Sequence, residues 1–393
     1  MAGHANARDR LESGLLPNRY QTATAFQPTC GERRVSLSAR GGCKLREEYN
    51  LKRMRSLMAA FAMLVVAALA LMAWTSLAGA SSKKASLTGA GSTFVAPLVS
   101  LWTQHYSAAD ITYGGGGSGA GIALVSARSV DFGASDAPMS PDQKAGCHGC
   151  VQIPWAYAAT SIPYHVSGVG YGLKLTGPIL ADIYLGHIKK WNDSRIKAIN
   201  KGVNLPNEDI VPVFRSDPSG TSFNVTDYLS KVSPEFKRTI GKGLQPAFKV
   251  GVGAKGSSGM AAKVSSTPGG IGYVDIAYSY KNHFTIAKLK NRAGRFILPK
   301  AASVAAVAAR VKKLPKDNAI SVVNPPASVK NGYPLCTFTW VIVPVQSSKA
   351  ADVKAFIKWA VTKGNGLGAS LLFLKIPKVV QTADLKTIAK VHS

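Results

Sequence analysis

The sequence predicts an α/β fold, and three observations support this prediction. From residue 84 onward, short apolar runs alternate with stretches of helical periodicity, which is typical of α/β proteins. Apolar residues make up 46% of the 393 residues, enough for a sizeable core without disulfides. No internal repeat is present, which argues against a solenoid or propeller. We therefore expect helices packed on sheets in the region after residue 84.

The elements follow one another along the chain with alternating character. The expected strands share β-branched, aromatic or glycine-flanked runs: 85–89, 111–113, 130–134, 271–274 and 338–343. The expected helices share apolar residues at three- and four-residue spacing: 94–106, 120–126, 179–185, 223–229 and 350–361. Residues 286–332 are rich in Lys, Ala and Pro and show the weakest pattern. We expect them to form surface elaboration.

The first 80 residues differ from the rest. Residues 1–54 are polar and irregular and fit poorly with secretion, so they form a doubtful leader that could reflect a gene start placed too far upstream. Residues 55–80 hold an apolar run that follows basic residues and ends in Ala-Gly-Ala, the pattern of a signal peptide. The alternative is a retained membrane anchor, because about 20 apolar residues can span a bilayer. We expect secretion across the cytoplasmic membrane to a periplasmic or cell-surface location.

The chain is strongly basic, with a net charge of +28. Residues 1–80 hold 11 Lys and Arg and 5 Asp and Glu. Residues 81–393 therefore hold 37 Lys and Arg and 15 Asp and Glu, which gives them a net charge of +22. Such a balance suits nucleic acid, an anionic surface or an anionic ligand. The basic residues are scattered and form neither a long run nor an aromatic-interleaved motif, so we expect no nucleic-acid partner.

The five cysteines include one close pair, Cys147 and Cys150, with CxxC spacing. Three interpretations remain open: a local disulfide, free thiols, or half of a metal site. No second CxxC or nearby histidine pair completes a metal-ligand set, so the sequence predicts no metal and no other cofactor.

Three segments combine glycine with hydroxyl residues just before a helical stretch: 89–97 (GAGSTFVAP), 114–121 (GGGGSGAG) and 215–222 (RSDPSGTS). The start of a helix exposes unpaired backbone N–H groups and partial positive charge, so an anion can bind there. Each segment alone is more typical of an ordinary cap and turn. None matches a P-loop or dinucleotide fingerprint.

The first and third of these segments, together with three further strings, resemble the phosphate-binding subunit of the Pst importer. The strings are residues 87–94 (LTGAGSTF), 130–138 (VDFGASDAP), 183–193 (IYLGHIKKWND), 215–223 (RSDPSGTSF) and 268–274 (PGGIGYV). Their order and spacing match the family across essentially residues 84–393. This resemblance implies a periplasmic-binding-protein type II fold. Two α/β lobes, 84–155 plus 338–393 and 160–335, would be joined by a hinge of two crossovers.

The resemblance also implies which residues bind phosphate. They are Thr93, Phe94 through its backbone N–H, Ser118, Asp136, Arg215, Ser219, Gly220 and Thr221, with Asp217 supporting Arg215. The residue types suit this role, since Arg offers a planar fork of donors and hydroxyls and amides supply the others. No residue is expected to be catalytic.

Asp136 would discriminate between anions. A carboxylate repels an anion unless that anion carries a proton to donate; phosphate near neutral pH does, and sulfate does not. The implied function is extracytoplasmic binding of inorganic phosphate by a monomer that delivers it to the permease subunits of an ABC importer. It would contact the membrane through the transporter or an uncleaved anchor.

Two other classes of function are weighed against it. A receptor for another oxyanion, such as arsenate, or a surface or signalling protein is the main alternative, and a phosphatase on the same scaffold is the weaker one. The dispersed histidines supply no base beside a nucleophile in the three segments. Four features depart from the family: the glycine run 114–117, Pro218 where glycine is common, the Cys147–Cys150 stretch, and the strong positive charge.

Overall fold

The computed structural model describes residues 54, 58–60, 63–65 and 84–393. The predictions for residues 1–53 and for most of 55–80 concern residues outside this range. Residues 83–393 form one compact unit, and the few residues described before it belong to a separate one. Among the described residues, no helix combines the length and the apolar character needed to cross a membrane.

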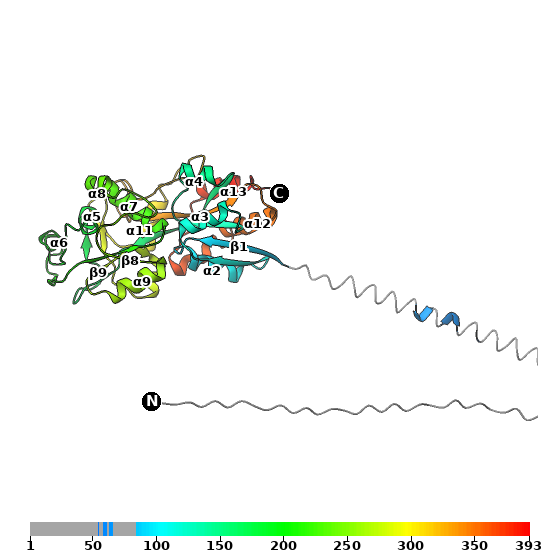
Figure 1. Ribbon diagram of the computed structural model, residues 1–393, viewed down its shortest axis with the longest axis horizontal. Helices are drawn as coiled ribbons and strands as arrows, with labels where there is room; N and C mark the ends of the chain where they lie inside the picture. Colours follow the sequence, from blue (N-terminus) through cyan, green and yellow to red (C-terminus); the bar gives the residue numbers. More distant parts are fainter. Residues whose placement is uncertain (1–53, 55–57, 61–62, 66–83) are drawn as a thin grey trace, which may run out of the picture. The chain divides into compact units, whose positions relative to one another are not determined.

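A six-stranded mixed sheet with its helices forms what we call the first lobe (Figure 1). Its strands, in spatial order, are β10 (Val274–Asp275), β4 (Cys150–Ser161), β13 (Cys336–Pro344), β3 (Phe132–Ser135), β1 (Ala85–Gly91) and β2 (Ala109–Gly114). Its helices are α2 (Ala96–His105), α3 (Ser118–Ser126), α4 (Pro141–Gly146), α12 (Ala350–Val361), the 3-10 helix η1 (Gly364–Leu371) and α13 (Lys378–Ile388).

Two smaller sheets with their helices form the second lobe. One sheet has the order β5 (Tyr164–His165), β9 (Gly270–Ile271), β7 (Val211–Arg215) and β8 (Val252–Ala254), and the other β12 (Phe296–Ile297), β11 (Lys288–Lys290) and β6 (Lys174–Leu175). The helices are α5 (Gly177–Leu185), α6 (Ser194–Ile199), α7 (Gly220–Val232), α8 (Pro234–Thr239), α9 (Gly256–Ser266), α10 (Ile276–Lys281) and α11 (Ala301–Ala308). The α/β prediction is confirmed, whereas the lobe boundaries predicted above stay a prediction.

Parallel pairing sets where the loops meet. Strand β1 pairs in parallel with β2 and β3, and β7 pairs in parallel with β8 and β9. The carboxyl ends of parallel neighbours meet at one edge of a sheet, which is where open α/β sheets bind ligands. The segments after β1, β2 and β3 in the first lobe and after β7 and β8 in the second therefore gather at two facing edges.

In the first lobe, α3 packs unusually close to its sheet because glycines leave room. A Cβ on Gly121 would lie 2.6 Å from Gly91 Cα and 2.7 Å from Ala134 O, and one on Gly133 would lie 2.5 Å from Gly121 O. Gly91 also has a φ of 138°. These contacts explain Gly91 and Gly133 of the first and second strings and Gly121 of the segment 114–121: a larger residue would push α3 away from β1 and β3.

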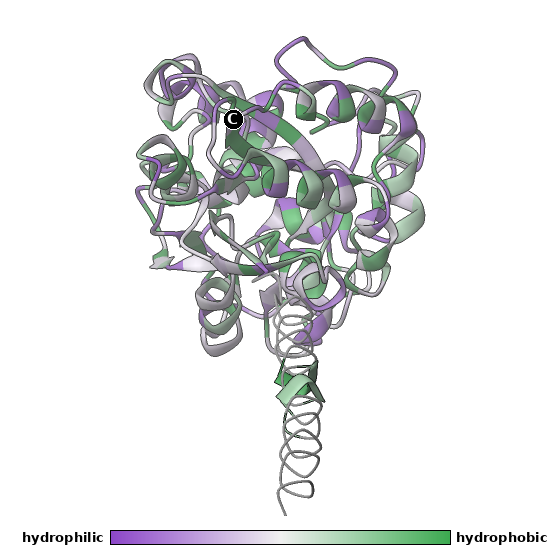
Figure 2. Cartoon of the chain, turned by 90° about the vertical axis from the view of Figure 1, so that its right-hand side faces the viewer, coloured by the Kyte–Doolittle hydropathy of each residue, from purple (hydrophilic) through white to green (hydrophobic). Residues whose placement is uncertain are grey.

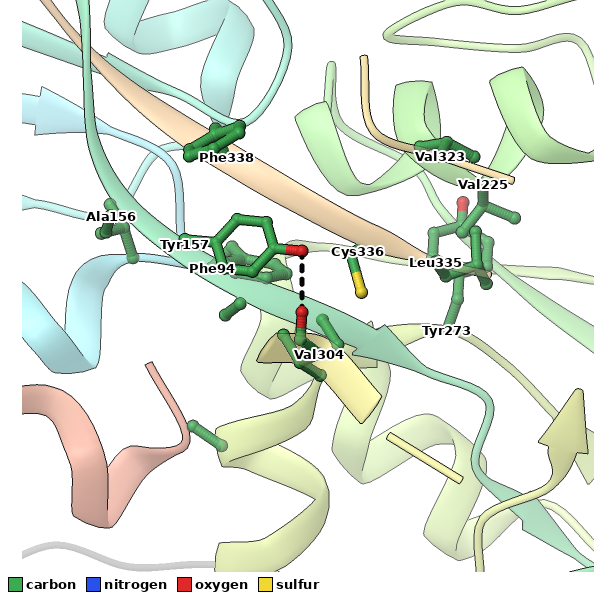
Figure 3. Packing of buried hydrophobic residues seen from close by; sticks show 14 of the residues in the cluster. Phe94, Ala156, Tyr157, Val225, Tyr273, Val304, Val323, Leu335, Cys336 and Phe338 are labelled. Carbon is green, nitrogen blue, oxygen red and sulfur yellow. Dashed lines mark hydrogen bonds between the residues drawn. The ribbon is translucent and has the colours of Figure 1, made fainter. Parts of the chain in front are cut away.

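The expectation that residues 286–332 form surface elaboration is wrong. Helix α11 buries Val304 and Val307, and the Tyr157 hydroxyl of β4 donates to Val304 O over 3.1 Å (Figure 3). Further on, the buried Asn318 donates to Gln152 O, and its own carbonyl accepts from Trp340 Nε1. The segment is therefore part of the core around β4 and β13, and its irregular pattern reflects short elements rather than exposure.

The single expected strand 271–274 is instead divided between two sheets. Residues Gly270–Ile271 join the second lobe as β9, while Val274–Asp275 pair with the end of β4 as β10. Figure 2 shows hydrophobic and hydrophilic residues interspersed along the helices. The other expected elements are present with shifts of a few residues at their ends.

Cys147 and Cys150 form a disulfide, which decides between the three interpretations of this pair. The bond joins the end of α4 to the first residue of β4. Cys147 is fully buried and packs with Ile122 and Val125 of α3. The remaining described cysteine, Cys336, is buried and free.

Candidate anion-binding site

The structure brings all eight predicted ligand residues to the facing edges of the two lobes. Thr93 and Phe94 follow β1, Ser118 opens α3 after β2, and Asp136 follows β3. Across from them, Arg215 ends β7, and the start of α7 carries the other three: Ser219, Gly220 and Thr221. All but Thr93 are buried.

Four hydrogen bonds join the lobes around the site. Gly220 N donates to Ser118 Oγ over 3.0 Å, and Gly119 N donates to Pro218 O over 3.0 Å. Asn224 Nδ2 donates to Asp136 O over 2.7 Å. Between Thr93 and Ser257 the amide of Ser257 donates to Thr93 Oγ1 over 3.1 Å. The two edges therefore meet directly, with the candidate ligand groups between them.

Two departures from the family explain each other. A Cβ on Gly119 would lie 2.5 Å from Pro218 Cβ, and a Cβ on Gly117 would lie 2.5 Å from Asp217 Oδ2 and 3.0 Å from Pro218 O. The glycine-rich segment after β2 therefore leaves room for Pro218 and for the side chain of Asp217. Gly117 itself has a φ of 93°, which favours glycine at the N-cap of α3.

Arg215 and Asp217 form a buried ion pair. Arg215 Nε donates to Asp217 Oδ1 over 2.7 Å, and Nη2 donates to Oδ2. The Gly256 amide donates to the same carboxylate over 2.9 Å. Burial alone would raise the pKa of Asp217, but these donors and the charge of Arg215 hold its pKa below the usual value. Within the described part of the chain no acceptor pairs with Arg215 Nη1, which leaves this group free to bind an anion.

Asp136 is a carboxyl group held in a buried, donor-rich setting. The Ser92 hydroxyl donates to Oδ1 over 2.5 Å. Burial raises the pKa of Asp136 to about 7, against the lowering effects of the Ser92 hydrogen bond, the Arg215 charge and the Ser118 hydroxyl. Near neutral pH the group therefore exists both as an acceptor and as a neutral acid.

The hydroxyl groups differ in what they have left to offer. Ser118 Oγ accepts from Asp136 N over 3.1 Å and from Gly220 N, which occupies both acceptor positions and leaves its proton to donate. Thr221 Oγ1 is buried with no hydrogen-bond partner among the described residues. Ser219 caps α7 by accepting from Ser222 N over 3.3 Å. A buried hydroxyl without a partner is costly, so an anion at Thr221 would remove an unfavourable state.

Two predicted amide donors are already engaged. Phe94 N donates to Ser92 Oγ over 3.0 Å, and Gly220 N donates to Ser118 Oγ. For these two groups the structure shows the protein partner, and binding to an anion would require sharing or exchange of the hydrogen bond.

Several residues around the site were not predicted. Ser92 binds Asp136, Asn224 bridges the lobes, and Tyr273 accepts from Arg215 N over 2.9 Å. Ser257 was missed although a signal was present: the segment 253–258 (GAKGSS) combines glycine and hydroxyl residues just before a helix, as the three chosen segments do. Asn224 lies one helical turn after Gly220, which could also have been noticed.

The comparisons with known proteins agree with the geometry. A family model described as "PBP superfamily domain" matches residues 78–363. The phosphate-binding protein PstS of Xylella fastidiosa strain Temecula1 is 38% identical over 304 residues, which cover 75% of this chain and 83% of the relative. The protein of the same name from Pasteurella multocida is 37% identical over 304 residues, which cover 75% of this chain and 87% of that relative.

The chain belongs to the PstS family of phosphate-binding proteins. Its fold is that of solved family structures. One is a high-affinity periplasmic phosphate-binding protein called PfluDING, bound with phosphate, which aligns with a TM-score of 0.60 at 20% identity. That alignment covers 77% of this chain and 93% of the neighbour. The periplasmic-binding-protein fold with two α/β lobes, implied by the resemblance, is thereby confirmed.

Proposed function

We propose that this protein is an extracytoplasmic receptor for inorganic phosphate that delivers its ligand to the permease of an ABC importer. The observation that carries the proposal is the meeting of Asp136, as an acceptor, with Arg215 Nη1 and the Thr221 and Ser118 hydroxyls, as donors, at one buried site. An anion that both accepts and donates hydrogen bonds satisfies this set. Family membership supports the same ligand.

Each predicted residue has a role in this proposal. Arg215 and the start of α7, with Ser219, Gly220 and Thr221, hold the charge of the anion. Thr93, the Phe94 amide and Ser118 approach it from the first lobe, and Asp217 orients Arg215. The Asp136 carboxylate accepts a hydrogen bond from a protonated oxygen of phosphate. Sulfate has no such proton and would leave this buried acceptor unsatisfied. The lobes would move as a hinge to admit the anion.

The proposal includes location and partners. The apolar run within residues 55–80 supports export across the cytoplasmic membrane, and the name of the PfluDING protein places that relative in the periplasm. Delivery would occur to permease subunits in the membrane, by a monomer. We infer a role in binding without catalysis, because the relatives are named as phosphate-binding proteins.

Calorimetric titration of the full chain with phosphate, arsenate and sulfate tests the ligand. We expect phosphate to bind and sulfate to give no heat at about pH 8, where Asp136 is mostly ionised. Arsenate also carries protons, so its affinity relative to phosphate decides between the two oxyanions. Absence of binding to phosphate would overturn the proposal, and turnover of a phosphomonoester would favour the phosphatase alternative.

Changing the pH tests the role of Asp136. Because its pKa is about 7, lowering the pH converts it from an acceptor to a neutral acid that can donate to a fully ionised anion. We expect the phosphate-to-sulfate affinity ratio to fall at least about tenfold between about pH 8 and about pH 5. In Asp136→Asn, which is neutral at both values, the ratio should be low and should not depend on pH. A ratio that changes equally in the two proteins would contradict the role.

A further inference from the structure

Ser92 lies directly after β1 and is not among the ligand residues implied by the family, yet it contacts one of them. It is fully buried. Its amide donates to Ala134 O of β3 over 2.9 Å, and its carbonyl accepts from the Tyr113 hydroxyl of β2 over 2.8 Å. The strands on both sides of β1 therefore hold the backbone of Ser92, which gives its side chain a fixed place beside Asp136.

Two backbone amides set the direction of the hydrogen bond between Ser92 and Asp136. Phe94 N donates to Ser92 Oγ over 3.0 Å, and Val95 N donates to it over 3.3 Å. A serine hydroxyl has two acceptor positions and one proton, so these amides leave Ser92 only its proton. The remaining contact, 2.5 Å to Asp136 Oδ1, therefore carries that proton to the carboxyl group. If an anion shares the Phe94 amide, the Val95 amide still holds one position.

This hydrogen bond makes the two oxygens of Asp136 different. Oδ1 accepts from Ser92, so a proton taken up by the carboxyl group is directed to Oδ2. Ser118 Oγ, the other hydroxyl beside this group, bonds to the amides of Asp136 and Gly220. Oδ2 is thus the oxygen left for the anion. Ionised, it accepts from a protonated oxygen of phosphate; neutral, it donates to a fully ionised anion.

Other charged and titratable groups act on Asp136 from the elements around it. Burial raises the pKa of Asp136, and Arg215, at the end of β7, lowers it through its charge. Burial also raises the pKa of Asp275, at the end of β10, and of Tyr113 well above their usual values, and the Asp136 charge adds to both shifts. Removing the Ser92 hydroxyl changes none of these three groups, so they act equally in the wild type and in a variant without it.

We propose that Ser92 is a positioning residue for anion selection: its hydroxyl binds Oδ1 of Asp136, favours the ionised carboxylate and leaves Oδ2 to test the anion for a proton. A donor to the charged form of a carboxyl group favours that form. Ser92 thereby extends discrimination against sulfate to lower pH. The inference rests on phosphate binding as proposed above and adds to it a residue that helps to set the pH range of selectivity.

The pH profile of selectivity tests the inference. Calorimetry on the full chain gives the ratio of phosphate affinity to sulfate affinity between about pH 5 and about pH 9. In Ser92→Ala we expect the midpoint of this profile to lie about one pH unit higher than in the wild type, because the carboxylate loses a charge-assisted hydrogen bond. Titration of the anions is the same for both proteins. A weaker affinity with an unshifted midpoint would indicate a merely structural role and would overturn the inference.

Ser135→Ala is the matched control. Ser135 is also fully buried and precedes Asp136, but its hydroxyl bonds to the backbone of Ala137 rather than to the carboxyl group. The midpoint in S135A should therefore equal that of the wild type. In the double variant S92A/D136N the ratio should not depend on pH, because no carboxyl group remains to titrate. Equal shifts in S92A and S135A, or a pH-dependent ratio in the double variant, would contradict the role of Ser92.

A measurement without any anion separates this inference from the proposed function. The carboxyl carbon of Asp136, assigned by its loss in Asp136→Asn, reports the titration of this group by NMR. We expect its midpoint to be about one pH unit higher in S92A than in the wild type. If the midpoint shifts in this way but phosphate does not bind, the proposed function fails and the effect of Ser92 on Asp136 stands. If both proteins titrate alike, the inference fails even where phosphate binds.

Discussion

The two lobes present opposite chemistry to the same space. The second lobe contributes the buried cation Arg215, held by Asp217, and the start of α7 with the unpartnered Thr221 hydroxyl. The first lobe contributes the acceptor Asp136 and hydroxyl groups whose directions are set by their neighbours. Attraction for an anion therefore resides mainly in the second lobe, and discrimination between anions resides mainly in the first. Because an anion must contact both lobes to bind, selection by the first lobe takes effect only when the lobes close.

Removing the Arg215 side chain should weaken phosphate binding more than any other change. Arg215→Ala removes charged donors and leaves Asp217 buried without its partner, so we expect phosphate affinity to fall by at least about a hundredfold. The phosphate affinity of Arg215→Lys should lie between those of the wild type and Arg215→Ala, because lysine keeps the charge but lacks the planar fork of donors. Calorimetry measures the change. Arg195→Ala, which removes surface ion pairs with Asp182 and Asp193, is the control and should leave affinity unchanged.

If Arg215→Ala lost less than about tenfold, attraction would have to reside elsewhere in the site, and the comparison between the lobes would fail. The variant also removes one partner of a buried pair, so its folding should be checked by circular dichroism before binding is measured.

The contact between Gly119 and Pro218 offers a sharper test of how the lobes meet. Gly119→Ala would place a Cβ 2.5 Å from Pro218 Cβ, so we expect closure to be impeded and affinity to fall about tenfold. Gly114→Ala is the control, because no atom lies within 4 Å of the position of its Cβ. Adding Pro218→Gly should restore binding to G119A. No restoration would mean that the loss arises within the first lobe alone.

The smallest effect is expected at the disulfide. Replacing Cys147 and Cys150 by serine opens a loop of only four residues, so chain entropy predicts a loss of about 2 kcal/mol in the free energy of unfolding. Urea denaturation measures this loss. Phosphate affinity should change less than about twofold. A larger change in affinity would show that the bond holds α3, and with it Ser118, in place.

Much of the site could be predicted because its chemistry lies in short contiguous strings. The segments around Thr93 and Arg215 combine a strand end, a turn and a helix start, a pattern that is compatible with an anion site. The resemblance to the family then singles out the individual ligand residues within them. The contact between Thr93 and Ser257 could not be predicted in this way. It joins residues 164 positions apart in different lobes, so it depends on how the lobes pack.

The fold shows the same limit. The strands 338–343 and 85–89 are recognisable from their composition, but the division of residues 270–275 between two sheets follows from pairing with β4 and β7. Residues 286–332 were predicted to be exposed because they are rich in lysine, alanine and proline and lack a clear period. Their burial depends on a few contacts, such as Val304 O with the Tyr157 hydroxyl, that no local pattern reveals.

The close approach of α3 to β1 and β3 has a consequence for how this protein can evolve. Gly91, Gly121 and Gly133 meet at distances that exclude any side chain, so no single substitution at one of them can be compensated by trimming another. Selectivity could drift through Asp136 or Pro218 by ordinary point changes. The three glycines that let α3 hold Ser118 against the sheet cannot change in this way. Saturation mutagenesis should therefore find that these three positions tolerate no substitution while positions around them do.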